Sequence, residues 1–227
     1  MALILQIETA TDRCSVSIAK DGITIAANSD EGDRNHARVL VPIIRDLLQT
    51  SGIQGEELDA IAVSKGPGSY TGLRIGVSTA KGLCYAWEKP LIAVNTLESM
   101  ASWFASNNHI QVDCFCPMID ARRLEVYTAL YSNILDTIQE TQALILDGNS
   151  FAEALNQKTI AFFGNGAQKF EKLLIKNPNA FFINDFTSSS EGMNALALNL
   201  FQERRFESVA YFEPFYLKDF YSPNKSA

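Results

Sequence analysis

The segment 3–26, LILQIETATDRCSVSIAKDGITIA, decides the fold that we expect. Its apolar run at 3–7 predicts one strand, and the alternation of apolar and polar residues at 14–19 predicts a second. The pair Asp21-Gly22 then precedes a third apolar run at 23–26. Such a pair between two runs is typical of a tight hairpin, because both turn residues need positive φ. The segment therefore predicts three strands, of which the last two form a hairpin.

Beyond this segment, helical and strand patterns alternate. The first half continues with helices near 40–48, 70–87 and 97–105 and with strands near 61–63 and 91–94. Pro42 lies inside the first of these helices, and Asn95 or Thr96 can cap the last. The second half repeats the order, with strands near 114–119, 125–131, 138–146, 160–163 and 180–183 and helices near 151–156, 169–174 and 191–205.

The repeated order predicts an α/β protein built by duplication. Three antiparallel strands, extended by alternating helices and strands, make a five-stranded mixed sheet with helices on its faces. This is the ribonuclease H-like unit of the actin, Hsp70 and sugar-kinase superfamily, used twice. We expect an N-terminal domain at 1–106 and a C-terminal domain at 107–227, whose last helix and tail are able to return to the first domain.

Composition narrows the classes of function. Lys and Arg number 19 against 26 Asp and Glu, so the formal net charge is −7, which is unsuited to a broad nucleic-acid surface. The sequence has no run of about twenty apolar residues, which a membrane-spanning helix would need. Four cysteines without an export signal indicate reduced thiols and a cytoplasmic location. The two histidines, His36 and His109, lie far apart and no His/Cys set has zinc spacing, so we expect no metal.

A glycine-rich loop precedes the helix near 70–87. Gly66 and Gly68 lie between a strand and a helix, where backbone N–H groups can cradle an anion. The spacing of a phosphate-binding P-loop is absent, and a tight turn explains the same glycines. Within the helix, Gly72, Gly76 and Ala80 continue a ridge of small residues with period four. Either the chain itself or a helix of another chain packs on this ridge, and we expect the latter, a dimerisation surface.

Polar residues follow the first strand and the second hairpin. Glu8, Thr9 and Thr11 lie where actin-like proteins contact phosphate or metal, although a hydrogen-bonded turn accounts for them equally. Arg122 lies at a charged hairpin tip, from which it could reach a phosphate or simply be solvated. With Gly66 and Gly68, these residues form our candidate for a vestigial nucleotide site.

Four motifs together carry a family resemblance. They are ILQIETATD at 4–12, His36 ahead of the first helix, GPGSYTGLRIG at 66–76 and IDARRLEVY at 119–127. In this order they resemble the TsaB (YeaZ) family, accessory subunits of the machinery that makes N6-threonylcarbamoyladenosine at position 37 of tRNA. The resemblance is close over the first 130 residues and weak beyond them. Leu124 and Glu8 depart from it, because the family usually has a small residue at the first position and often Asp at the second.

The resemblance implies a catalytic paralogue, TsaD, as the partner of a heterodimer. TsaD-like proteins carry a metal-binding His-x-x-x-His pair at the start of a helix, and Thr96 and Met100 stand at the matching positions here. Neither side chain replaces imidazole as a ligand. The resemblance therefore implies a non-catalytic scaffold that binds TsaD and the ATPase TsaE and meets tRNA only through the complex. We expect no cofactor of its own, ATP or ADP only at the complex interface, and a homodimer when alone.

Two helices supply the expected partner interface. Its residues are His36, Leu40, Ile44, Leu47, Tyr70, Gly72, Leu73, Arg74, Gly76 and Ala80. A second hypothesis is a nucleotide-dependent kinase or hydrolase of the actin-like superfamily, acting on its own with Glu8 as a metal-linked acid.

Overall fold

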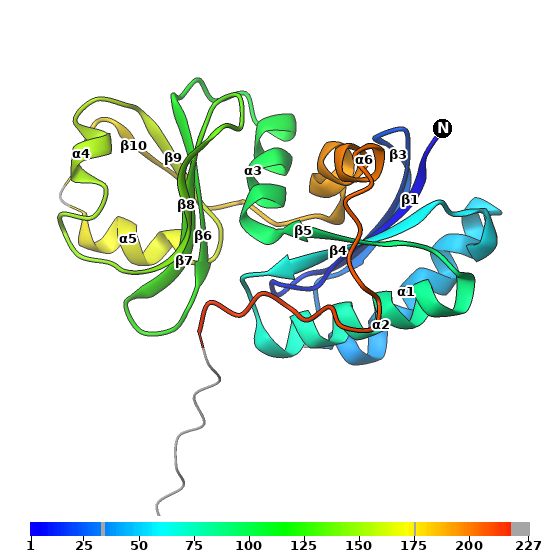
Figure 1. The fold of residues 1–227 in the computed structure, drawn as a ribbon. Helices are drawn as coiled ribbons and strands as arrows, with labels where there is room; N and C mark the ends of the chain where they lie inside the picture. The colour runs from blue at the N-terminus through cyan, green and yellow to red at the C-terminus, as the bar shows by residue number, and fades with distance from the viewer. Residues whose placement is uncertain (33–34, 175, 219–227) are drawn as a thin grey trace, which may run out of the picture.

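The computed structural model describes residues 1–32, 35–174 and 176–218. The first half of the chain forms one five-stranded sheet (Figure 1). Its strands are β1 (Leu3–Glu8), β2 (Cys14–Lys20), β3 (Ile23–Asp30), β4 (Ala60–Gly66) and β5 (Leu91–Asn95), in the order β3-β2-β1-β4-β5. The first three strands are antiparallel, whereas β4 runs parallel to β1 and β5. Asp21 and Gly22 both have positive φ (50° and 78°), so the hairpin prediction is confirmed.

The second half of the chain forms a second sheet with the same topology. Its strands are β6 (Cys114–Asp120), β7 (Glu125–Ser132), β8 (Thr137–Ile145), β9 (Ile160–Phe163) and β10 (Ala180–Ile183). Their order is β8-β7-β6-β9-β10, with β6 parallel to β9 and antiparallel to β7. The predicted pair of ribonuclease H-like sheets is therefore confirmed.

The helices lie on the faces of these sheets. They are α1 (His36–Ser51), α2 (Tyr70–Trp87), α3 (Thr96–Asn107), α4 (Ala152–Leu155), α5 (Ala167–Leu173) and α6 (Asn194–Gln202), with short 3₁₀ turns at Gly55–Glu57 (η1) and Ser190–Met193 (η2). Asn95 is the cap of α3, since its side chain accepts the N–H groups of Leu97 and Glu98. The last helix expected from sequence is divided into η2 and α6, and α6 ends at Gln202. Within the described residues, no helix has the length and apolarity needed to cross a membrane.

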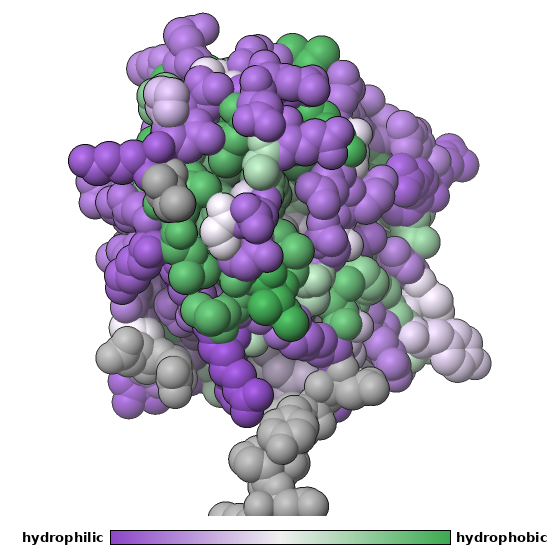
Figure 2. Space-filling model, turned by 90° about the vertical axis from the view of Figure 1, so that its left-hand side faces the viewer, coloured by the Kyte–Doolittle hydropathy of each residue, from purple (hydrophilic) through white to green (hydrophobic). Residues whose placement is uncertain are grey.

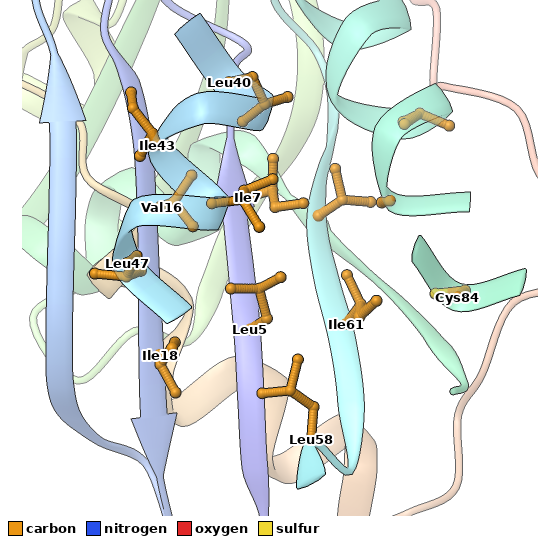
Figure 3. Packing of buried hydrophobic residues seen from close by; sticks show 14 of the residues in the cluster. Leu5, Ile7, Val16, Ile18, Leu40, Ile43, Leu47, Leu58, Ile61 and Cys84 are labelled. Atoms are coloured by element: carbon orange, nitrogen blue, oxygen red, sulfur yellow. The ribbon is translucent and has the colours of Figure 1, made fainter. Parts of the chain in front are cut away.

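The apolar faces of α1 and α2 build the first core. Leu40, Ile43 and Leu47 of α1 point toward Ile7 and Val16 of the sheet (Figure 3). Burial of such side chains stabilises a fold by about 1.5–3 kcal/mol each. Helices α1 and α2 therefore cover the same face of the first sheet, and they pack against each other there (Figure 1).

On the opposite face of the first sheet, and on one face of the second, the packed helix comes from the other half of the chain. Helix α3 follows the first sheet in sequence, but Leu97, Met100 and Phe104 pack into a core with β6, β7 and β9 of the second sheet. Helix α6 follows the second sheet, yet Ala197 and the preceding Met193 pack on β1, β4 and β5 of the first. The chain division expected near residue 106 thus coincides with the end of α3, a helix that belongs by packing to the second core.

Strand β10 is an edge of the second sheet. All four of its residues are half-buried, in contrast to β9, whose four residues are fully buried.

Figure 2 views the molecule from the side of the C-terminal domain and shows hydrophobic residues at the surface among hydrophilic ones. The aromatic cluster of this domain packs Phe162 against Phe170 and Phe182 with ring centroids 5.0 and 5.2 Å apart. These phenylalanines are core residues, as their sequence context indicates.

The small-residue ridge of α2 is occupied by the same chain. A Cβ built on Gly72 would lie 2.0 Å from the carbonyl oxygen of Thr9, and one on Gly68 would lie 2.4 Å from that of Ala10. A Cβ on Gly76 would lie 2.1 Å from Thr9 Oγ1. The expectation that a partner helix packs on this ridge is therefore wrong. The glycines are required because the turn after β1 approaches the backbone of α2.

We predict that Gly72→Ala destabilises the isolated protein while Gly82→Ala does not. The first change forces the β1 turn away from α2 and should cost roughly 1–3 kcal/mol. Gly82 lies in the same helix, and a Cβ there would meet nothing within 4 Å, so alanine should add up to about 1 kcal/mol through helix propensity. Chemical denaturation of both variants measures the difference. Equal stability of the two variants would contradict the close approach.

Candidate functional site

The carboxyl ends of β1 and β4 hold the candidate acid, Glu8. Its side chain is buried, and Oε1 accepts the N–H of Ala10 at 2.6 Å and the hydroxyl of Ser64 at 2.9 Å. Its other oxygen, Oε2, has no hydrogen-bond partner among the described residues. Burial raises the pKa of Glu8 to about 7, against the lowering effect of these hydrogen bonds. The group is thus a desolvated carboxyl held by its own chain.

The two threonines after Glu8 are also engaged within the chain. Thr9 Oγ1 donates to the carbonyl of Gly72 at 2.9 Å. The Thr11 hydroxyl lies 2.5 Å from that of Ser188. His36 Nε2 donates to the Thr11 carbonyl at 2.9 Å, so the buried histidine ties the start of α1 to this turn. The hydrogen-bonded turn, one of the two interpretations of these residues, matches the structure.

A segment from the second half of the chain closes the same turn. Ser188 accepts a hydrogen bond from Arg13 through its carbonyl at 3.4 Å, in addition to its contact with Thr11. The Ser190 hydroxyl lies 3.0 Å from that of Ser15 on β2, and Ser190 N donates to the same oxygen. The sequence patterns did not indicate this role. The one available signal was the run of three serines at 188–190, directly ahead of the last helix.

The glycine-rich loop does not fit a phosphate. Gly66 N donates to Thr96 Oγ1 at 3.1 Å, Ser69 N donates to the Ala10 carbonyl at 2.7 Å, and Gly72 N donates to the Ser69 hydroxyl. A Cβ on Gly66 would lie 2.6 Å from the carbonyl oxygen of Phe215, near the end of the described chain. Because these donors are taken and an acceptor faces the loop, the anion-cradle interpretation is wrong for this conformation. The tight-turn interpretation is correct.

Arg122 lies apart from these groups. It is exposed at the tip between β6 and β7 with φ of 72°, and its N–H donates to Asp120 Oδ1. Within the described chain, no hydrogen bond or ion pair joins it to Glu8 or to the Gly66 loop. The two halves of the chain are instead linked by Asn165, which accepts from Asp120 N at 2.9 Å and donates to Asp12 at 3.3 Å. Asp12 ends the motif at 4–12, and Asn165 lies in the turn between β9 and α5, but the sequence did not predict that these two residues link the halves of the chain.

The two positions that match a metal-binding pair are internal. Thr96 is fully buried and accepts the Gly66 N–H. Met100 is buried in the second core against Gly164 and its neighbours. In the part of the chain that the structure describes, no group of three or more His, Cys, Asp or Glu side chains could hold a metal ion. The four cysteines are free and buried.

Much of the expected partner interface is core. Leu40, Ile44, Leu47 and Leu73 are 1–3% exposed, and Ala80 is fully buried. These residues cannot contact a partner in this conformation, which corrects the sequence expectation. The physical reason is that helical spacing identifies an apolar stripe without telling which surface covers it. Tyr70 is half-buried and Arg74 is exposed, so these two expected interface residues do reach the surface.

We predict that Glu8 makes stability fall as pH rises. The folded pKa of about 7 exceeds the ordinary value of 4.5, so the folded state binds the proton more tightly, and its advantage is lost between these two pH values. The Glu8→Gln variant lacks this dependence. From pH 4.5 to pH 8 the unfolding free energy of the variant minus that of the wild type should rise by on the order of 3 kcal/mol. Urea titrations across this range measure it, and a constant difference would contradict the burial of Glu8.

Known proteins with similar sequences belong to tRNA threonylcarbamoyladenosine biosynthesis. A family model described as the tRNA N6-adenosine threonylcarbamoyltransferase TsaD matches residues 27–226. The TsaB protein of Escherichia coli, a tRNA threonylcarbamoyladenosine biosynthesis protein, is 34% identical over 95% of this chain and 94% of its own. The TsaB protein of Bacillus subtilis is 31% identical over 75% of this chain and 74% of its own.

Solved structures agree with the sequence relatives. A crystal structure from Pseudomonas aeruginosa, of a protein described as similar to the peptidase YeaZ, superposes with a TM-score of 0.84. It is 25% identical and covers 96% of this chain and 100% of its own. The likeness thus extends over both sheets. The chain belongs to the TsaB (YeaZ) family of tRNA threonylcarbamoyladenosine biosynthesis proteins.

Proposed function

We propose that this chain is a non-catalytic scaffold subunit for tRNA N6-threonylcarbamoyladenosine formation in the cytoplasm. In this role it binds and organises the catalytic paralogue TsaD and the ATPase TsaE, and it meets tRNA only through the complex. The observation that carries the proposal is the state of the candidate active site. Glu8 is buried with one oxygen held by its own chain, and the loop at Gly66 has an acceptor, the Phe215 carbonyl, in place of an anion.

The residues around the candidate site also support a non-catalytic role for this chain. Thr96 and Met100 offer no imidazole, and Thr96 is already bonded to Gly66. The segment at 188–190 is hydrogen-bonded across the turn that follows β1, where a substrate phosphate would need room. We therefore assign ATP or ADP only to the interface with a partner, where a second chain supplies the donors that this one has used internally.

The outward faces of α1 and α2 supply the surface for TsaD. The two helices lie side by side on the first sheet and turn their remaining faces to solvent (Figure 1). Val41 of α1 is 58% exposed and is flanked by exposed Arg38 and Arg45. An exposed aliphatic side chain bordered by arginines matches the composition of an interface centre and its rim. The interface that we propose uses these faces, because the small-residue ridge is occupied within the chain.

The same faces are available to a second copy of the chain. A homodimer of the isolated protein was expected from the ridge of α2, which packs internally. We keep self-association as a proposal on the outer face around Val41, since related surfaces of paralogues can reproduce a two-fold contact. Sedimentation of the isolated chain tests it, and a monomer at high concentration would contradict it.

One observation favours the alternative of an independent enzyme. Glu8 Oε2 is buried without a partner among the described residues, and its pKa of about 7 suits proton transfer near neutral pH. A kinase or hydrolase would show ATP turnover by the purified chain that Glu8→Gln abolishes. We expect no turnover in either protein, and turnover sensitive to Glu8 would replace the scaffold proposal.

We predict that Val41→Asp abolishes co-elution with TsaD in size-exclusion chromatography. A carboxylate at the centre of an apolar contact must be taken out of water, which costs several kcal/mol, and pairing with Arg38 or Arg45 does not repay that cost. The matched control is Ile134→Asp, because Ile134 is 75% exposed on the loop between β7 and β8 of the other domain. Both variants should melt like the wild type. Equal co-elution of both variants with TsaD would place the interface elsewhere.

A further inference from the structure

The chain after α6 forms a strap, residues 207–218, that crosses from the first domain to the second (Figure 1). It begins at β5, where Glu207 N donates to the Leu91 carbonyl at 2.9 Å. It continues along α2, and it reaches the second sheet through an ion pair between Lys218 and Glu125 of β7. The strap is therefore not a loose tail over this path.

Contacts with α2 and with the end of β4 fix the strap at several points. Lys81 Nζ donates to the carbonyls of Ala210 and Phe212, at 3.2 and 2.9 Å. Phe215 N donates to the Lys65 carbonyl at 2.7 Å, and Phe212 also packs against the first core. Beyond it, the ring of Tyr216 lies 4.9 Å from that of Tyr70, centroid to centroid. Main-chain bonds and apolar packing together give the strap a defined position.

Between the strap and α2 lies a groove with a volume of about 350 Å³. Arg74, Ser78 and Lys81 line one side, and their spacing places them on one face of α2. Glu213 and Tyr216 line the other side from the strap. Arg74 and Lys81 outnumber Glu213 among the lining residues, so the groove is locally cationic in a chain whose net charge is −7.

Arg74 is preorganised at this groove. Its Nε donates to the Tyr216 hydroxyl at 3.3 Å, and its guanidinium carbon lies 4.4 Å above the Tyr70 ring. In the part of the chain that the structure describes, neither Arg74 nor Lys81 lies within ion-pair distance of a carboxylate. Guanidinium groups held in one orientation bind carboxylates with two parallel hydrogen bonds. Within the described residues the terminal nitrogens of Arg74 have no hydrogen-bond partner, so a carboxylate from outside can bind them, in competition with Glu213 of the same groove.

The surroundings of the groove fit a protein partner. Tyr211 of the strap is 87% exposed, Tyr85 one turn beyond Lys81 is 83% exposed, and Phe215 is 40% exposed. Exposed tyrosines beside an arginine are the residue types that dominate binding energy at protein interfaces. A nucleic acid would add many phosphates that the acidic surface of the chain repels. These observations favour an acidic side chain on a protein over an RNA backbone.

We propose that the groove between α2 and the strap binds a carboxylate-bearing side chain of TsaD, with Arg74 as its principal contact. The proposal rests on the scaffold function above and extends the partner surface from the outer faces of α1 and α2 onto the strap. The strap is then part of the interface, and its hydrogen bonds to Lys81 of α2 and to Lys65 of β4 hold it in place there.

The test is the affinity for TsaD of Arg74→Glu, measured by titration calorimetry beside wild type and Lys172→Glu. Lys172 is an exposed lysine on α5, so its reversal makes the same change of charge away from the groove. We expect the Kd to rise at least tenfold for Arg74→Glu and to stay within twofold for Lys172→Glu, with unchanged melting temperatures. A single Asp→Lys or Glu→Lys change on TsaD should then restore binding of Arg74→Glu.

Other outcomes overturn the proposal in distinguishable ways. Wild-type affinity of Arg74→Glu for TsaD would refute the groove while leaving the scaffold function intact. Failure of the wild-type chain to bind TsaD would refute both. If Arg74→Glu binds TsaD normally but weakens the binding of tRNA to the complex, the groove binds phosphate. Lys81→Met, which releases two strap carbonyls, should also weaken binding to TsaD, and unchanged affinity would remove the strap from the interface.

Discussion

The close approach of the β1 turn to α2 is the constraint on which the rest of the structure depends. The carbonyl oxygens of Thr9 and Ala10 occupy the space where side chains of Gly72 and Gly68 would begin. With those glycines, α2 can lie against the end of β1, and Thr9 can bond to the Gly72 carbonyl. This contact sets the position of α2 over the first sheet, and α1 packs beside α2 through Leu40 and its neighbours.

The same approach bears on function. The turn that an actin-like enzyme would use for phosphate is here hydrogen-bonded to α2, to His36 and to the serines at 188–190. The polar groups around this turn are thus largely hydrogen-bonded within the described chain, apart from Glu8 Oε2 and Arg13 Nε. The partner surface that we propose lies elsewhere, on the outer faces of α1 and α2 and along the strap. This distribution suits the proposed scaffold role, in which the outer surface carries the interaction.

The sequence predicted the fold well, since the signals for it are local. The Asp21-Gly22 turn, the span of α2 and the repeated order of strands and helices each follow from spacing along the chain. The burial of Leu40 and Gly76 could not be assigned in the same way. Periodicity places each residue on a helix face, whereas the surface that covers the face comes from segments distant in sequence, such as Ile7 for Leu40 and Thr9 for Gly76. The return of the last helix and tail to the first domain was expected. The individual contacts of the strap and of the serines at 188–190 were not, because they join residues more than a hundred positions apart.

The central claim is that this chain supports tRNA modification without contributing a reacting group. Reconstituted threonylcarbamoyladenosine formation with TsaD, TsaE, tRNA, ATP and threonylcarbamoyl adenylate as the group donor tests it most directly when Glu8→Gln replaces the wild-type chain. Glu8 is the one acid at the actin-like position, and glutamine keeps the oxygen that accepts from Ala10 and Ser64. The account predicts wild-type rates of modification with the variant. Loss of modification by a variant that melts normally and still binds TsaD would show that Glu8 takes part in the chemistry.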